Sequence, residues 1–154
     1  MAGKLERSGA GSFAARIAHH WCELALEADA RQQNDDAEAA LRHAREAAPQ
    51  APRPLILAGQ RARTRGAHEA ALQSWATLLV AHPGAFNLVA RDYADCAIQL
   101  GKAAEALERL EALYRRSPTS DLLAALSRLD DDTPRRERRQ LAHLQQQPDR
   151  RAHV

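Results

Sequence analysis

Three prolines stand at nearly equal intervals in this chain, and their spacing constrains its fold more than any other feature. Pro49, Pro83 and Pro118 each follow a run rich in alanine or leucine, and the intervals between them are 34 and 35 residues. Proline lacks an amide donor and disfavours helix in the residue before it, so each proline is expected to end a helix. The spacing therefore predicts a helical unit that is repeated along the chain.

Other positions keep the same register. When each proline is numbered 32, the units begin at Ala18, Pro52 and Asn87. Positions 8 and 20 are then small, position 24 is large and apolar, and position 15 is glycine in two units. The residues are Ala25, Gly59 and Ala94 at 8; Gly66 and Gly101 at 15; Ala37, Ala71 and Ala106 at 20; Leu41, Trp75 and Leu110 at 24; and Ala44, Leu78 and Leu113 at 27. This period and pattern are typical of the tetratricopeptide repeat, which pairs two helices, A and B.

Composition favours the same fold. Alanine and leucine, both strong helix formers, dominate the 45% of hydrophobic residues, while aromatic residues make up only 4%. We therefore expect an all-α tetratricopeptide-repeat superhelix, an α-solenoid of three regular repeats and a shortened capping repeat. The cap should have helices at 122–129 and 137–144 around a turn at 130–134. Residues 1–17 are expected to be the tail of a preceding helix and a linker, 18–148 the repeat domain and 149–154 a disordered tail.

No pattern in the chain indicates chemistry of its own. The net charge of +2 comes from interspersed residues and gives no basic face for nucleic acid. Cys22 and Cys96 form no CxxC pair, and no apolar run approaches the roughly 18 residues of a membrane span. His19 and Cys22 lie three apart, but a closed zinc site needs four ligands, so ordinary helix residues are favoured. We expect no enzymatic activity, no cofactor and no metal.

In this repeat family, helix A forms the concave face through positions 2, 5, 9, 12 and 13. These are His19, Cys22, Leu26, Asp29 and Ala30 in the first unit; Arg53, Ile56, Gln60, Arg63 and Thr64 in the second; and Leu88, Arg91, Asp95, Ile98 and Gln99 in the third. The predicted partner-binding groove consists of Arg53, Ile56, Gln60, Arg63, Leu88, Arg91, Asp95 and Ile98. Its arginines suit an acidic or amphipathic segment, because guanidinium forks pair with carboxylates. A merely soluble, arginine-rich surface is the alternative.

One stretch resembles a particular family. Ile17-Ala-His-His-Trp-Cys-Glu-Leu-Ala25, preceded by Lys4-Leu-Glu-Arg7, is similar to the middle of the lipopolysaccharide assembly protein B family. Leu57-Ala-Gly-Gln60 and the AALxxW element that ends at Trp75 fit as well, and the resemblance covers roughly residues 4–148. It implies a cytoplasmic adaptor at the inner membrane that brings the lipid A pathway deacetylase to the membrane protease FtsH. A homodimer is left open.

The family's membrane anchor and its two CxxC pairs are absent from this sequence. The resemblance therefore implies a cytoplasmic repeat fragment, without membrane insertion or metal binding; a short paralogue is the rival explanation. Two other functions stay open. One is a generic repeat module for assembly of the cell envelope or for secretion. The other is a chain labelled N-acetylglucosaminyl transferase by repeat analogy, although it has no catalytic domain.

Overall fold

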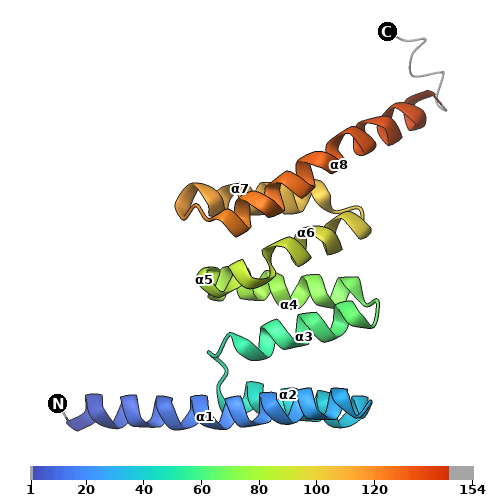
Figure 1. The fold of residues 1–154 in the computed structure, drawn as a ribbon. Coiled ribbons are helices and arrows are strands. Elements are labelled where there is room, and N and C mark those ends of the chain that lie inside the picture. Colours follow the sequence, from blue (N-terminus) through green and yellow to red (C-terminus); the bar gives the residue numbers. More distant parts are fainter. Residues whose placement is uncertain (1, 146–154) are drawn as a thin grey trace. The chain divides into compact units, whose positions relative to one another are not determined.

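The computed structural model describes the backbone of residues 2–145 and the side chains of residues 12–132, and within these ranges it contains helices and no strand (Figure 1). The all-α prediction is confirmed. In chain order the elements are α1 (Ala2–Ala30), α2 (Asn34–Ala47), α3 (Arg53–Thr64), α4 (His68–Ala81), α5 (Pro83–Phe86), the 3-10 turn η1 (Asn87–Val89), α6 (Ala90–Gln99), α7 (Ala103–Arg116) and α8 (Ser120–Gln145). None of these described helices is long and apolar enough to cross a membrane.

The chain divides into two compact units, of which the first ends at Phe86 and the second begins at Asn87. In the first unit α1 packs against α2, α3 packs against α4, and both α1 and α2 contact α3. In the second unit α6, α7 and α8 all contact one another. The division falls where the third sequence repeat was expected to begin.

The helix ends before the three prolines share one backbone geometry. Ala48, His82 and Ser117, which directly precede them, have φ angles of −141°, −140° and −150° and ψ angles of 81°, 69° and 81°. Each still donates its amide to the carbonyl four residues earlier, and the helix stops there. The proline ring excludes the helical conformation from the residue before it. The prediction that these prolines end helices is confirmed.

The turns after α1, α3 and α6 also share one geometry. Gly66 and Gly101 have φ angles of 78° and 71°, and Gln32 occupies the corresponding place with φ of 60°. The next residue in each turn donates its amide to the carbonyl five residues earlier at 2.8 Å, which is the Schellman helix end. Glycine adopts this left-handed conformation freely. In the turn after α1 the same conformation is adopted by Gln32, a residue for which it is strained, and no feature of the sequence predicted this.

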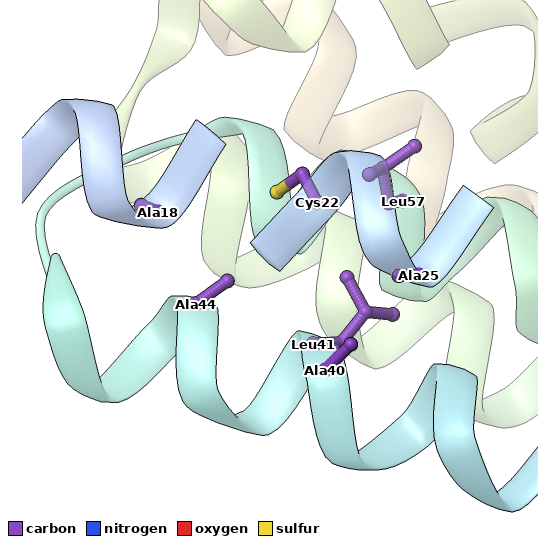
Figure 2. Close-up of a cluster of buried hydrophobic side chains, with 7 residues drawn as sticks. All are labelled: Ala18, Cys22, Ala25, Ala40, Leu41, Ala44 and Leu57. Carbon is purple, nitrogen blue, oxygen red and sulfur yellow. The ribbon is translucent and has the colours of Figure 1, made fainter. Parts of the chain in front are cut away.

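The buried core follows the predicted register. The residues at positions 8, 20, 24 and 27 are all buried in each of the three sequence repeats. In the first unit a cluster formed by α1, α2 and α3 contains Ala18, Cys22, Ala25, Ala40, Leu41, Ala44 and Leu57 (Figure 2). Alanines dominate this cluster, so the helix axes can approach closely and the larger side chains fill the remaining space.

Gly59 of α3 packs directly against the ring of Trp75 of α4. A Cβ atom added to Gly59 would lie 2.1 Å from Nε1 of Trp75 and 2.3 Å from its Cε2. The indole is fully buried, and its Nε1 donates to the carbonyl of Ile56 at 3.4 Å. The tryptophan at position 24 therefore requires glycine at position 8. The other two repeats have the smaller leucine at position 24 and alanine at position 8.

Two expectations about helix boundaries are wrong. The turn at 130–134 does not form, because α8 continues without a break through Pro134. Proline removes one amide donor there, while the arginine, glutamate, glutamine and leucine residues that follow favour helix. Similarly, α1 runs unbroken through the expected boundary after residue 17, so no linker separates residues 2–17 from the first repeat. The predicted tail at 149–154 lies outside the described residues.

Candidate functional site

The predicted groove residues are distributed over the two compact units. Arg53, Ile56, Gln60 and Arg63 lie on α3 in the first unit, whereas Leu88 lies on η1, and Arg91, Asp95 and Ile98 lie on α6 in the second. Of the residues in the first unit, Gln60 lines a cleft. Of those in the second unit, Arg91 and Asp95 form ion pairs with residues of α8.

The cleft in the first unit lies between α1 and α3, next to the turn that follows α1. It encloses about 570 Å³. We call it the α1–α3 cleft; its lining consists of Leu26, Asp29, Gln32, Asn34, Leu57, Gln60, Arg61, Thr64 and Arg65. Leu26, Asp29, Gln60 and Thr64 belong to the concave positions that the register predicted, while Arg61, Arg65 and Leu57 were missed. These four residues of α1 and α3 thus line one cleft in this unit.

An ion pair joins the two walls of this cleft. Nε of Arg61 donates to Oδ1 of Asp29 at 3.0 Å and to Oδ2 at 2.8 Å, and Nη2 reaches the carbonyl of Asn34 at 3.5 Å. The Arg61 and Asp29 side chains are only 11% and 30% exposed. A charge-assisted pair that is partly shielded from water fixes the spacing of the helices more firmly than an exposed one. The cleft is thus a preformed feature of the unit.

The cleft offers a partner both apolar and polar surface. Leu26 is 42% exposed although it is a large apolar residue, and it shares the lining with Leu57. The amide side chains of Gln32 and Gln60 stand exposed in the same lining. Apolar surface provides affinity, and polar groups near it fix the orientation of a bound chain. This combination suits a peptide segment that inserts one apolar side chain.

Arg53 is already paired within the first unit. Its Nη2 donates to Oε1 of Glu23 at 2.7 Å, and its Nη1 lies 2.6 Å from Nδ1 of His19. The hydrogen bond from Arg53 lowers the pKa of Glu23 below its usual value. The guanidinium thus has a carboxylate partner on α1. The positive charge that the sequence indicated at this position is largely compensated.

In the second unit, two arginines are likewise paired with carboxylates of a neighbouring helix. Nη2 of Arg91 donates to Oδ1 of Asp121 at 3.3 Å, and Arg128 donates both to the Asp95 carboxylate and to the carbonyl of Arg91. These bonds connect α6 to α8. Two of the three arginines on which the basic groove depended, Arg53 and Arg91, therefore hold helices together. Leu88 is the most exposed of the predicted residues here, at 75%.

The side chains between residues 12 and 132 include no group of three or more histidine, cysteine or acidic residues placed to hold a metal ion. Cys22 and Cys96 are both buried in the core and are not joined by a disulfide. Burial raises the pKa of the Cys22 thiol, which disfavours the nucleophilic thiolate. The His19 ring contacts the guanidinium of Arg53. The geometry at these residues is that of packed helices.

Comparison with models of protein families and with curated proteins returned no match for this chain.

Proposed function

We propose that the chain is a tetratricopeptide-repeat array of three repeats closed by α8 as a capping helix, and that it serves as a non-enzymatic protein-binding scaffold. Three structural features recur at the predicted spacing and support the array: the helix ends before proline, the Schellman turns and the buried positions 8, 20, 24 and 27. An α-solenoid buries a shared core between successive repeats and leaves the face of helices A open for a partner.

The proposed binding function rests mainly on the α1–α3 cleft. It is hollow, it is braced by the Asp29–Arg61 pair, and it exposes Leu26. A partner segment that inserts an apolar side chain beside Leu26 and Leu57 would bury that surface. Amides on the rim would hydrogen-bond to its backbone. Because Arg53 and Arg91 have carboxylate partners, an amphipathic segment suits the surface better than a purely acidic one.

The stretch from Ile17 to Ala25 supports a more specific role. By its resemblance to the lipopolysaccharide assembly protein B family, we propose that the scaffold acts in the cytoplasm and regulates lipopolysaccharide biosynthesis. Its partners in that role would be the protease FtsH and the lipid A pathway deacetylase. A generic assembly module of the envelope would share the array and the cleft but would bind other proteins.

A pull-down from a Gram-negative lysate tests both the scaffold function and the role in lipopolysaccharide biosynthesis. The full chain, Leu26→Arg in the cleft and the matched control Val80→Arg would serve as baits; Val80 is 81% exposed on α4 and does not line the cleft. We expect the wild type and the control to enrich the protease and the deacetylase, and Leu26→Arg to lose them.

The other outcomes distinguish the general scaffold function from the specific role in lipopolysaccharide biosynthesis. If the wild type enriches different proteins that Leu26→Arg loses, the scaffold is correct and the lipopolysaccharide role is wrong. If Leu26→Arg retains every partner while its helical circular dichroism is unchanged, the cleft is not the binding site.

A further inference from the structure

A second apolar surface lies on α1, away from the α1–α3 cleft. Phe13, Ile17, Trp21, Leu24 and Ala28 follow one another at intervals of four, four, three and four residues, so they share one face of the helix. We call this row the α1 stripe. Phe13 is 58% exposed, and Ile17, Trp21 and Leu24 are half-buried. Scattered exposed apolar residues are normal, but a continuous row marks an interaction surface.

Part of the stripe is already covered within the unit. Trp21 and Leu24 pack against the buried cluster that α1 forms with α2 and α3, and Ala28 is only 6% exposed. Phe13 is exposed, and Ile17, Trp21 and Leu24 keep part of their surface open. An apolar row on one face of a helix fits a second helix.

The stripe ends in a hollow formed with α2. This outer hollow encloses about 330 Å³ and has the ring of Trp21 on one wall, stacked on His43 with 4.4 Å between ring centroids. Leu24, Ala28, Ala39 and Ala40 supply the rest of its apolar lining. Because three of these residues are alanine, the hollow can accept a large side chain from outside.

Phe13 is such a side chain, and it lies on the same helix. The first half of α1 extends past the end of α2 (Figure 1), and Phe13, which belongs to this half, is exposed. When two α1 helices pair antiparallel about a two-fold axis between residues 20 and 21, Ile17 of one copy faces Leu24 of the other. In the same register Phe13 faces Ala28, in the floor of the outer hollow. The row is thus complementary to itself.

Charges beside the stripe agree with this register. Arg16 and Glu27 lie on the same edge of the α1 stripe, because residues eleven apart are close to three full helical turns apart. Antiparallel pairing brings Arg16 of each copy near Glu27 of the other. In the single chain Glu27 is 3.8 Å from Arg31, an exposed pair of the kind that contributes little and is easily exchanged.

We propose that the α1 stripe is a self-association surface, through which two copies of this chain form a two-fold dimer by antiparallel pairing of α1. Phe13 of each copy fills the outer hollow of the other. This surface is separate from the α1–α3 cleft, so dimerisation leaves both clefts available to partners. A dimer would present two copies of the same cleft and would strengthen binding to a multivalent partner.

Analytical ultracentrifugation of the full chain tests the dimer. We expect the wild type to sediment as a dimer at about 100 μM, a concentration well above the micromolar dissociation constants of modest interfaces. Phe13→Glu should weaken dimerisation more than tenfold, because aromatic anchors buried at an interface are among the residues that contribute most to binding. The matched control Val80→Glu alters an equally exposed apolar residue elsewhere and should leave the dimer intact. A monomeric wild type, or an unaffected Phe13→Glu dimer, would overturn the proposal.

Two further variants test the antiparallel register. Arg16→Glu and Glu27→Arg should each weaken the dimer, and their combination should restore it. In the double variant Ile17→Cys with Leu24→Cys, mild oxidation should give a covalent dimer, whereas either single variant should stay monomeric on a non-reducing gel. Cross-linking of Ile17→Cys alone would indicate parallel helices and refute the register. A monomeric Phe13→Glu chain that still binds its partners would separate this surface from the proposed scaffold function.

Discussion

Replacing Gly59 with alanine offers a sharp test of the packing between α3 and α4. The new methyl group would lie 2.1 Å from Nε1 of Trp75 and 2.6 Å from its Cδ1, whereas non-bonded carbon atoms normally stay about 3.5–4.0 Å apart. Overpacking of this kind costs about 3 kcal/mol at the upper end of its usual range. The higher helix propensity of alanine returns about 1 kcal/mol. We therefore expect Gly59→Ala to lower the free energy of unfolding by about 2 kcal/mol.

A double-mutant cycle identifies the contact responsible. Trp75→Leu alone should cost about 2 kcal/mol, because it leaves a cavity and removes the hydrogen bond to the carbonyl of Ile56. The double variant would carry alanine and leucine, the pair found at these positions in the first and third repeats. It should be more stable than the sum of the single effects by about 2 kcal/mol, as expected for residues in contact.

Urea unfolding followed by circular dichroism measures all three variants. Gly84→Ala is the matched control, because a Cβ atom at Gly84 meets nothing within 4 Å, and its stability should be unchanged or slightly higher. A Gly59→Ala chain as stable as the wild type, or single effects that simply add, would refute the close packing of Gly59 on Trp75.

Three other predictions concern the turn, the cleft and the surface charges. Gln32→Gly should raise the free energy of unfolding by about 0.5–1 kcal/mol, because glycine relieves the left-handed strain, and Gly66→Gln should lower it by a similar amount. Asp29→Ala should cost about 1–2 kcal/mol in urea unfolding, because it leaves the nearly buried Arg61 without its carboxylate. Arg53 lowers the pKa of Glu23 in the folded chain, so the pair contributes stability at pH 7 that is lost as the pH falls through that pKa. Wild type and Glu23→Gln should therefore differ in thermal stability at pH 7 and converge as the pH falls through the lowered pKa of Glu23; a constant difference down to the acid limit of folding would refute this contribution.

The features that were predictable from the sequence are those that one residue type determines locally. Proline at position 32 fixes the end of a helix and glycine at 15 permits the turn, so Pro83 and Gly66 could be placed without a structure. Pro134 shows the limit of this reasoning, because a single lost hydrogen bond did not outweigh the helix-forming residues around it. The same rule was therefore right three times and wrong once.

The site was less predictable, because it depends on which charges meet. The register assigned Leu26 and Gln60 to one face by helical spacing alone, and both line the α1–α3 cleft. It could not show that Arg53 meets Glu23 or that Arg61 meets Asp29, because those pairs depend on the distance and rotation between α1 and α3. A spacing of 30–32 residues between opposite charges, slightly less than one repeat, was the signal available in the sequence.

Hydrogen exchange of the full chain with and without a captured partner tests the binding function most directly. The account predicts that the partner slows amide exchange in α1 and α3 around the α1–α3 cleft, at residues 26–34 and 57–65. In Leu26→Arg this protection should disappear, and in Val80→Arg it should persist. Protection confined to other parts of the chain, with exchange around the cleft unchanged, would contradict the account.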